Sequence, residues 1–536
     1  MSRSHSRTTP AAVAAGLLLA ACADRVPLAP DASLATSSAT PSATPSATPS
    51  AQRLTPTTQT TRYLVGVEPG ARLPAPVLAA AGGRLVDSIP AGDVLVIEGA
   101  TNPAALQVEG VRFVEAAFET TLDAQREASS TLPESEGAVA PGTPIGVPPW
   151  STSGMQWEMK NVKADEVWAL TQGGAGARVC IVDSGVDANH QELAGRVALR
   201  ANFVQSPAAE AGPGVIGDGN GHGSHVAGTV AAGGVVMQGV APRATILGAR
   251  ALGNNNSGFE DWIIRAMDWC GDNGAHVINM SLGGIRYRGL TNLVTAPRAY
   301  QEAVARQTSR GVVVVVSAGN SNLRLPNPGG ALRVVPSEVE GAITVGATGP
   351  VTRVGTFLLN LVPTTLPFAP PRWDPFDARQ VWQGPDGKAF YSNFGTSVEI
   401  FAPGGRGGIP LTYPHFRVNN VFQGDVRDNV YSLCSGGTSQ NGVTNASGGP
   451  SATAGSCLNQ PNRYVAYAGT SMAAPIVSGA AAVLYAELGA VRSVANRERV
   501  TRCLLTTTDN IGPAETFGGG RLNVRRALDA LRAGEC

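Results

Sequence analysis

The sequence predicts an α/β fold, a mostly parallel β-sheet flanked by helices on both faces and preceded by a small α+β domain. From residue 150 onward, short apolar runs alternate with segments of helical periodicity, as expected for parallel strands joined by crossover helices. Residues 61–124 instead show short strands and short helices in close succession. The 65 glycines, 38 prolines and only 15% charged residues suit a loop-rich, exported protein.

The small domain is expected to contain strands at 63–67, 92–98 and 111–115 and helices at 76–81 and 102–108. In the large domain, 150–536, apolar runs predict strands at 178–183, 245–252, 276–282, 312–317, 343–347 and 398–402. Helices are expected at 164–171, 223–232, 260–270, 296–309, 472–487, 493–505 and 523–531. Insertions near 349–390 and 405–463 interrupt the alternation, and loops of this length are usually functional or mobile.

The N-terminus has the features of a targeting segment. Arg3 and Arg7 precede a short apolar run at 11–21, and the following Leu-Ala-Ala-Cys resembles the lipobox of bacterial lipoproteins. We therefore expect residues 1–22 to be a signal peptide, lipidation at Cys22, and either a bacterial cell-envelope or a secreted location. An ordinary signal peptide cut near the same alanines is the alternative. Membrane contact is expected only through the lipid anchor, because the apolar run is too short to span a bilayer.

Two segments are expected to be linkers. Residues 23–60 carry three copies of Ser-Ala-Thr-Pro, and such a tract cannot bury a core. Residues 125–149 are rich in proline, glycine and acidic residues without periodicity, which indicates an exposed, cleavable connector. Lys+Arg and Asp+Glu both number 40, so nothing in the charge predicts a nucleic-acid partner.

Six cysteines follow Cys22, and an even number in an exported chain suggests disulfides, although six allow 15 pairings. We expect the pairs Cys180–Cys270, Cys434–Cys457 and Cys503–Cys536. A metal site is a weaker hypothesis, because no pair has C-x-x-C spacing.

Four polar residues lie at positions that suit chemistry. Asp183 ends a buried strand, His222 precedes a helix of small residues, Asn320 follows another core strand, and Ser471 stands where a helix begins. Taken singly, they could be a capping Asp, a core His, a turn Asn and an N-cap Ser. Pro475 is expected in the first turn of the helix that follows Ser471.

Together the four predict nucleophilic catalysis. A neutral His222 can take the proton of Ser471, and a buried Asp183 can orient the imidazole and stabilise its charged form. Asn320 and the backbone N–H of Ser471 would then donate hydrogen bonds to the oxyanion.

These segments, in the order Asp, His, Ser, resemble the subtilisin-like serine peptidases over residues 156–531. The resemblance implies a serine endopeptidase that acts on polypeptide substrates, is a monomer and needs no cofactor for its chemistry. It also implies a substrate cleft with two walls. One wall is formed by Ser281, Leu282 and Gly283, and the other by Leu252 and Gly253. Ser317, Ala318 and Gly319 are expected to line the specificity pocket. Tight turns are the alternative explanation of these glycines.

Residues 61–124 resemble the inhibitor-type propeptide of the same family. The resemblance implies an intramolecular inhibitor that is removed by self-processing between residues 123 and 157. An independent domain that persists in the mature protein is the alternative.

The chain departs from the family pattern at two places. Ser224 stands where threonine is usual, and Glu192 stands where many members have a calcium-binding aspartate. The companion loop, 233–238, is short and lacks the asparagines that supply oxygen ligands. That calcium site is therefore doubtful, no metal ligand is assigned, and structural calcium elsewhere stays possible but not located.

Two other functions are compatible with parts of the pattern. A catalytically silent envelope lipoprotein could use the fold for binding, but it would not need Asp183, His222, Asn320 and Ser471 together. A related acid-active serine carboxyl peptidase would need a glutamate in the base position, where this chain has His222.

Overall fold

A computed structural model describes residues 59–121, 156–287, 297–328, 330, 332–349, 387–389, 391–405, 417–418, 421–422, 429–435 and 462–536. The expected signal peptide with Cys22, the linker up to residue 58, the connector 125–149 and Cys457 lie outside these residues. Large parts of the two insertions also lie outside them.

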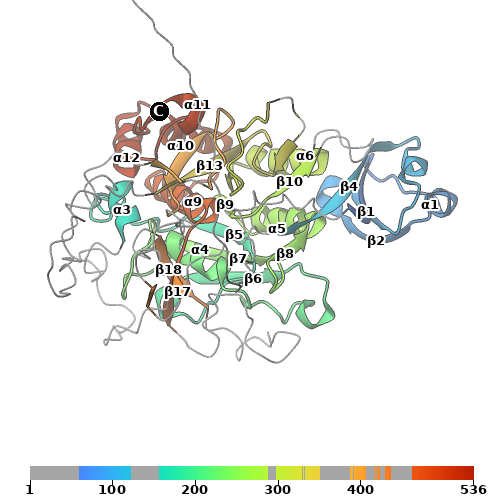
Figure 1. Ribbon diagram of the computed structural model, residues 1–536, viewed down its shortest axis with the longest axis horizontal. Coiled ribbons are helices and arrows are strands. Elements are labelled where there is room, and N and C mark those ends of the chain that lie inside the picture. The colour runs from blue at the N-terminus through green and yellow to red at the C-terminus, as the bar shows by residue number, and fades with distance from the viewer. Residues whose placement is uncertain are drawn as a thin grey trace, which may run out of the picture. The chain divides into compact units, whose positions relative to one another are not determined.

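The large domain is built on an eight-stranded sheet with the order β14-β13-β11-β9-β5-β7-β6, in which β15 also pairs with β13 (Figure 1). Every pairing is parallel except that of β13 with the short β14. The strands are β5 (Arg178–Asp183), β6 (Val197–Asn202), β7 (Thr245–Arg250), β9 (Val277–Met280), β11 (Val313–Ser317), β13 (Ala342–Gly349), β14 (Gly387–Lys388) and β15 (Ile400–Pro403).

Helices cover both faces of this sheet, which confirms the predicted fold class. Val179 and Ile181 of β5 pack in one apolar cluster with α4 and α9, whereas Cys180 and Val182 pack on the other face with α5. Successive side chains of a strand point to opposite faces of the sheet. Because helices cover both faces, every position of the strand is apolar, which explains the uninterrupted apolar runs. The helices are α3 (Trp157–Asn161), α4 (His222–Ala231), α5 (Glu260–Asp272), α6 (Arg298–Ser309), α9 (Thr470–Glu487), α10 (Val494–Thr506), α11 (Ala514–Phe517) and α12 (Val524–Ala533).

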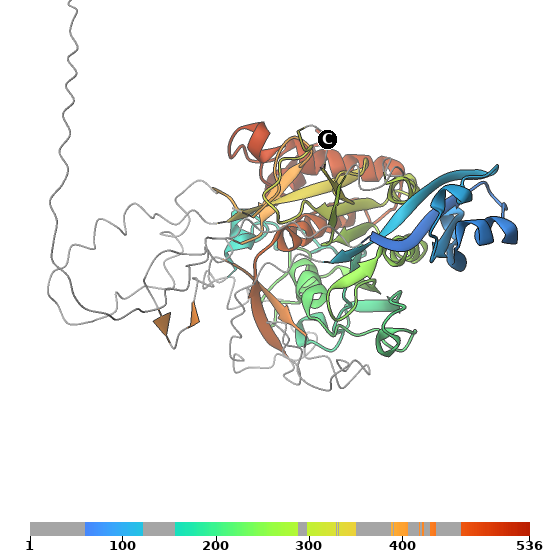
Figure 2. The same ribbon diagram turned by 45° about the vertical axis from the view of Figure 1, so that its right-hand side comes forward.

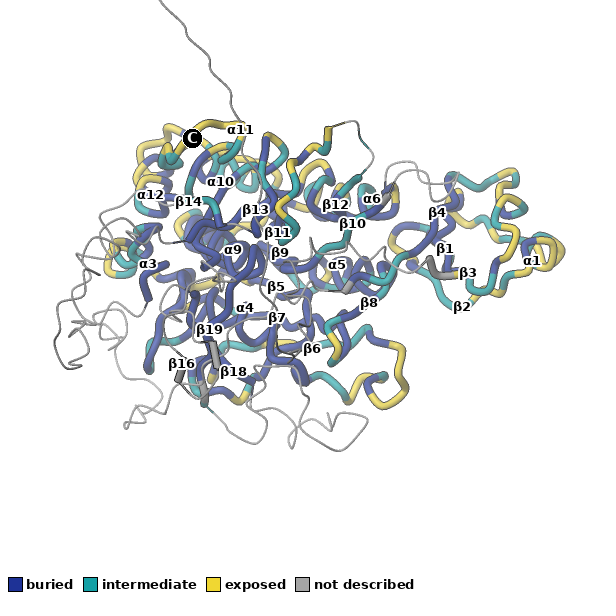
Figure 3. The backbone as a smooth tube through the Cα atoms, viewed as in Figure 1, coloured by how far each residue is buried: buried dark blue, intermediate teal, exposed yellow. Residues whose placement is uncertain are grey.

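The helix α9 is a long, buried helix of the core, and Figure 3 shows it buried along most of its length. Its small residues allow this position. A Cβ added to Gly479 would lie 2.6 Å from Cβ of Val240, closer than two side chains can approach. The same holds for Gly228 of α4, where an added Cβ would lie 2.2 Å from Cδ1 of Leu433.

The N-terminal strands form a separate antiparallel sheet with the order β2-β3-β1-β4-β8, and Figure 2 shows the first four in blue as a twisted layer. The helix α1 packs on one face of it through Ala81, Val77 and Leu78. The elements are β1 (Gln59–Val67), α1 (Ala75–Ala81), β2 (Arg84–Ile89), β3 (Val94–Glu98), β4 (Val111–Thr121) and β8 (Ser257–Phe259). The last strand, β8, belongs to the large domain, so β4 continues the N-terminal sheet onto it.

Six further short strands form three pairs in the described part of the large domain. The first pair, β10 (Gly284–Tyr287) and β12 (Leu332–Val335), is antiparallel, and so is the second, β18 (Val430–Cys434) and β19 (Arg463–Tyr467). The pair β16 (Arg417–Val418) and β17 (Val421–Phe422) lies within the second insertion.

Two predictions of local structure are wrong, and a strand of the central sheet was not predicted. Residues 164–171 form a succession of turns instead of a helix, beginning after Lys163 with φ +62°, and the helix lies earlier, at α3. The strand β6 was missed because its sequence is partly exposed and carries Arg200. Pro475 lies in the second turn of α9, because that helix begins at Thr470.

Two of the three expected disulfides are present, Cys180–Cys270 and Cys503–Cys536. Cys434 is also disulfide-bonded, while its expected partner Cys457 lies outside the described residues. Within the part of the chain that the structure describes, no helix is long and apolar enough to cross a membrane.

Candidate active site

The four candidate residues lie beyond the carboxyl ends of the central strands. Asp183 is the last residue of β5, and His222 is the first residue of α4. Asn320 follows shortly after β11, and Ser471 is the second residue of α9. Figure 1 shows β5, α4 and α9 grouped in the middle of the large domain. This edge is where ligands and reacting groups gather in open parallel sheets.

Asp183 and His222 are hydrogen-bonded to each other. Nδ1 of His222 lies 2.8 Å from Oδ1 of Asp183, and the two residues are 4% and 0% exposed. The same Oδ1 accepts the backbone N–H of Ser184 at 2.7 Å. A buried carboxylate at Nδ1 favours the tautomer that carries its proton there, which leaves the lone pair on Nε2.

The contact between α4 and β5 requires glycine at residue 223. A Cβ on Gly223 would lie 2.1 Å from the carbonyl oxygen of Gly185 and 3.1 Å from Cβ of Asp183. Any larger residue after His222 would therefore push the helix away from the strand and lengthen the bond between His222 and Asp183.

Asp218 holds the N-terminus of α4. Its Oδ1 accepts the hydroxyl of Ser184 and the backbone N–H of Gly221, both at 2.8 Å. Its Oδ2 accepts the N–H and the hydroxyl of Ser224 at 2.8 and 2.7 Å. A carboxylate at this end of a helix satisfies free N–H groups and interacts favourably with the helix dipole. Ser224, where the resemblance leads us to expect threonine, supplies the hydroxyl of this arrangement.

Ser471 is connected to the strand β9 through two hydrogen bonds with Ser281. Oγ of Ser471 donates to the carbonyl of Ser281 at 3.3 Å, and Oγ of Ser281 donates to the carbonyl of Ser471 at 2.7 Å. In a regular helix the carbonyl of Ser471 would accept the N–H of residue 475, but Pro475 has none. Pro475 thereby leaves this carbonyl for Ser281.

Ser281 is held in turn by a buried chain of side chains. Nδ2 of Asn279 donates to Oγ of Ser281 at 2.9 Å, and Oγ of Ser478 donates to Oδ1 of Asn279 at 2.8 Å. Asn279, Ser281 and Ser478 are each 0% exposed. Because Ser478 lies two turns along the helix from Ser471, the chain fixes the start of α9 against β9 at two points.

The orientation of the Asn320 amide is set by Thr470. Oδ1 of Asn320 accepts the backbone N–H of Thr470 at 2.9 Å and its hydroxyl at 2.8 Å. The hydroxyl of Thr470 also accepts the N–H of Gly319 at 3.1 Å. With both donors on Oδ1, the NH₂ group of Asn320 is directed away from Thr470 and remains available as a donor.

Asn393 supports the backbone on either side of Asn320. Its Nδ2 donates to the carbonyl of Ala318 at 2.7 Å, and its Oδ1 accepts the N–H groups of Ser321 and Leu323 at 3.2 and 2.8 Å. Gly319 has φ +95°, and a Cβ there would lie 2.7 Å from Nδ2 of Asn393. This glycine therefore permits the turn that presents Asn320.

The residues expected to bind substrate lie in three segments next to the central strands. Ser281, Leu282 and Gly283 join β9 to β10, while Ser317, Ala318 and Gly319 end β11 and begin the turn before Asn320. The N–H of Leu252 donates to the carbonyl of Asp183 at 3.1 Å, and the N–H of Gly253 to that of Ser257 at 2.8 Å. A tight turn thus leads from β7 to β8.

The edge of β8 is occupied by β4 of the N-terminal sheet. The two strands pair antiparallel, with Thr121 opposite Ser257, Thr120 opposite Gly258 and Glu119 opposite Phe259. An added strand at this edge is one of the general ways in which a sheet binds an extended peptide.

His225 lies one turn after His222 but has a different role. Burial, and to a smaller extent the nearby His222, lowers the pKa of His225 to about 3. Its ring stacks on Tyr467, and its Nε2 lies 3.1 Å from the carbonyl of Val430. It therefore stays neutral at physiological pH and packs α4 against the β18–β19 pair.

Comparison with known families finds a match over most of the large domain. Residues 174–520 match the model of the Subtilase family. The chain is 28% identical over 370 residues to subtilisin DY of Bacillus licheniformis, which covers 68% of this chain and 96% of that protein. It is 27% identical over 380 residues to thermitase of Thermoactinomyces vulgaris, covering 70% and 96% of the two proteins.

Solved structures agree on the fold. One is fervidolysin from Fervidobacterium pennivorans, described as a keratinolytic enzyme related to subtilisin, with a TM-score of 0.57 at 20% identity. The match covers 88% of this chain and 61% of the fervidolysin chain. The epidermin leader peptide processing serine protease of Staphylococcus aureus has a TM-score of 0.60 at 20% identity, covering 88% and 98% of the two chains.

Proposed function

Because the chain belongs to the subtilase family and is a serine-type endopeptidase, we propose that Ser471 is the nucleophile, His222 the general base and Asp183 the residue that orients it. The observation that carries this assignment is the buried 2.8 Å bond between His222 and Asp183. In the first step, Oγ of Ser471 attacks the scissile carbonyl while Nε2 of His222 takes its proton.

The same histidine then completes the reaction. The imidazolium of His222 gives its proton to the leaving amine, the C–N bond breaks, and an acyl ester remains on Ser471. Water attacks this ester with His222 again as base, which releases the acid and restores the serine. Asp183 holds the imidazole through its bond to Nδ1 and stabilises the imidazolium.

Asn320 is proposed as the side-chain donor to the oxyanion, together with the backbone N–H of Ser471. Thr470 supports this role, because both of its donors engage Oδ1 of Asn320 and leave the NH₂ group for substrate. One such donor is typically worth about 3–4 kcal/mol of barrier.

A fluorophosphonate probe tests the nucleophile. It should label the mature protein, and the label should disappear in Ser471→Ala but persist in the matched control Ser478→Ala, whose hydroxyl lies on the same helix but bonds Asn279. A folded, mature protein that takes no label would instead support the catalytically silent lipoprotein.

Substrate is proposed to bind as an extended strand between two walls, the segment Ser281–Gly283 and the segment Leu252–Gly253, with Ser317–Gly319 lining the specificity pocket. Support comes from the hydrogen bonds of Ser281 with Ser471 and of Gly319 with Thr470, and from β4, which pairs with the edge of β8 as an added strand. Profiling of a peptide library with the mature enzyme measures which side chain this pocket prefers.

The N-terminal sheet is proposed as an intramolecular inhibitor that the enzyme removes itself. Its support is the interface with the large domain. Arg62 forms a buried ion pair with Asp261 at 2.7 Å, and Glu115 accepts the N–H groups of Arg298 and Ala299, which begin α6, at 2.9 and 3.0 Å. β4 also pairs with β8, the strand that follows the proposed cleft wall Leu252–Gly253.

Processing is tested by blocking the chemistry. His222→Ala and Ser471→Ala should each leave the chain uncut between residues 123 and 157 when expressed in a protease-deficient host. Normal cutting of both variants would mean that another enzyme removes the N-terminal unit.

Export through the signal peptide and lipidation at Cys22 are proposed on the sequence alone. Metabolic labelling with a palmitate analogue, compared between wild type and Cys22→Ala, measures the lipidation.

A further inference from the structure

The carboxylate of Glu192 is enclosed by hydrogen-bond donors. The residue is 0% exposed and lies in the turn Gln191–Leu193. Its two oxygens accept the backbone N–H groups of the loop after α4 and the hydroxyl of Tyr464. The bonds come from Gly234 (3.0 Å) and Val235 (2.9 Å) to Oε2, and from Val236 (2.6 Å), Met237 (3.0 Å) and Tyr464 (3.0 Å) to Oε1.

These donors leave no place for a cation at Glu192. A carboxylate offers about four lone-pair sites, and the loop 234–237 with Tyr464 already directs donors at both oxygens. Calcium requires six to eight oxygen atoms with their lone pairs directed inward. Here the loop directs N–H groups inward instead, and the positive ends of their dipoles would repel a cation.

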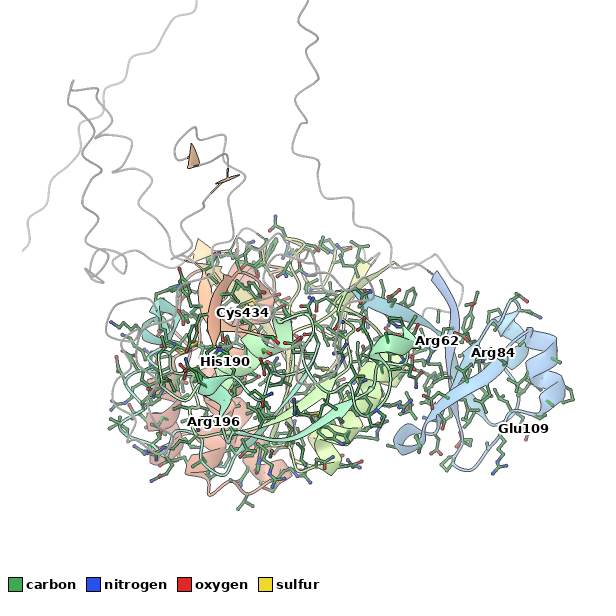
Figure 4. The ribbon with its side chains drawn as sticks, turned by 90° about the horizontal axis from the view of Figure 1, so that it is seen from below. Arg62, Arg84, Glu109, His190, Arg196 and Cys434 are labelled. Carbon is green, nitrogen blue, oxygen red and sulfur yellow. A yellow bond between two sulfur atoms is a disulfide. The ribbon has the colours of Figure 1, made fainter. Side chains whose placement is uncertain are left out.

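Two neighbours point to the same conclusion. The amide of Gln156, which could offer an oxygen ligand, is already used: its Oε1 accepts the N–H of Gln238 at 2.9 Å, and its Nε2 donates to the carbonyl of Gln238 at 2.8 Å. The guanidinium of Arg196 adjoins the loop, because a Cβ on Gly233 would lie 2.9 Å from its Nε. Figure 4 shows the side chains of this region with His190 and Arg196 labelled. The described residues contain no group of His, Cys, Asp and Glu side chains that could hold a metal ion.

We propose that the four backbone N–H groups of residues 234–237 take the place of the calcium ion that the family resemblance implies here, so that the carboxylate of Glu192 is held by hydrogen bonds and not by a metal. The loop 233–238 closes around an anion instead of a cation, and its short length follows from this, because it needs only to bring four successive N–H groups to one carboxylate. This clamp is therefore independent of calcium.

The clamp joins the segments that carry the catalytic residues. Glu192 lies in the chain between β5, which ends at Asp183, and β6. The loop that it binds follows α4, which begins at His222. Tyr464 lies in β19, shortly before Ser471. The hydroxyl of Tyr464 also accepts a hydrogen bond from Nε2 of Gln191 at 3.0 Å. The adjacent residues Gln191 and Glu192 therefore both bind the turn to β19.

The test uses the full chain with Ser471→Ala, so that proteolysis plays no part and the result does not depend on the catalytic assignment. Melting temperatures are measured in millimolar calcium chloride and in excess EGTA for this background, for Glu192→Gln and for the exposed control Glu166→Gln. The amide of glutamine turns an N–H group toward the N–H groups of the loop. Glu192→Gln should therefore lower the melting temperature by about 5–10 °C in both buffers, while Glu166→Gln should change it little.

The response to calcium decides the proposal. An equal calcium effect in the background and in Glu192→Gln supports it. A calcium-induced rise in the background that is lost in Glu192→Gln would show that Glu192 is a calcium ligand. An unchanged melting temperature of Glu192→Gln would show that the carboxylate does not hold the loop.

Hydrogen exchange covers the case in which Glu192→Gln does not fold. In the Ser471→Ala background alone, peptides that span 233–238 should exchange slowly and at the same rate with and without calcium. Fast exchange in both buffers, or protection that appears only with calcium, overturns the proposal.

Discussion

The hydroxyl of Thr470 gives the sharpest test of how the oxyanion donor is positioned. Thr470→Val keeps the shape of the side chain but removes this hydroxyl, which donates to Oδ1 of Asn320 at 2.8 Å and accepts the N–H of Gly319 at 3.1 Å. The backbone N–H of Thr470 still holds the same Oδ1 at 2.9 Å. The asparagine should therefore become less well oriented without leaving the site.

The expected loss follows from these two bonds. A neutral hydrogen bond contributes about 0.5–1.5 kcal/mol net, so the substitution should raise the barrier by about 1–2 kcal/mol. Since 1.36 kcal/mol is a factor of ten, kcat should fall about 5- to 30-fold with little change in KM. Asn320→Ala removes the donor itself and should lower kcat about 10²–10³-fold.

The assay measures kcat and KM on a chromogenic peptide amide, with active sites counted by burst titration. Thr470→Ser retains the hydroxyl and should keep most of the activity. In the Asn320→Ala background, Thr470→Val should have almost no further effect, because the group that it positions is gone. A Thr470→Val enzyme within twofold of wild type, or fully additive losses in the double variant, would refute the reasoning.

Three other outcomes are expected. Ser281→Ala, which removes the donor to the carbonyl of Ser471 and the acceptor of Asn279, should lower kcat about tenfold and also lower the melting temperature by a few degrees. Burial raises the pKa of Glu158 from 4.5 to about 8, while Gln156 lowers it less. Because the folded state then binds a proton that the unfolded state releases, stability should fall from pH 4.5 to 8 by up to a few kcal/mol. Thermal melts of Ser471→Ala should show this loss, and Glu158→Gln should abolish it. Glu115→Gln weakens the cap on α6 and should speed digestion of residues 59–121 by added chymotrypsin at least about tenfold, whereas the exposed Glu109→Gln (Figure 4) should not.

The parallel sheet was predictable because its strands are buried on both faces. The strand β5 lies at the predicted bounds, Arg178–Asp183, and its uninterrupted apolar run is the signal. The strand β6 carries no such run, since its residues are half-buried or exposed. The helix α9 begins at Thr470, before the alanine-rich segment that suggested a start at Met472. Helix starts are poorly marked where side chains from other segments supply the hydrogen bonds.

The polar candidates were predictable only where a residue type suggests chemistry. Asp183 and His222 stood out and are bonded to each other. Thr470, Asn279 and Asn393 did not stand out, because their roles depend on partners far away in the chain. One signal was available: Pro475 leaves the carbonyl of Ser471 without a helical donor, so a donor from another segment was required.

The helix that carries His222 is held at both ends by buried carboxylates, and the two ends differ physically. Asp218 lies at the N-terminus of α4, where the helix dipole favours a negative charge. Glu192 binds the loop just after the C-terminus, where the same dipole disfavours it by about 0.3–1 kcal/mol. Four backbone N–H groups and Tyr464 offset this cost, because hydrogen bonds to a charged group contribute about 1.5–3 kcal/mol each. The carboxylate at the unfavourable end is therefore stable only while the loop 233–238 stays closed. Opening of that loop and displacement of α4 should occur together.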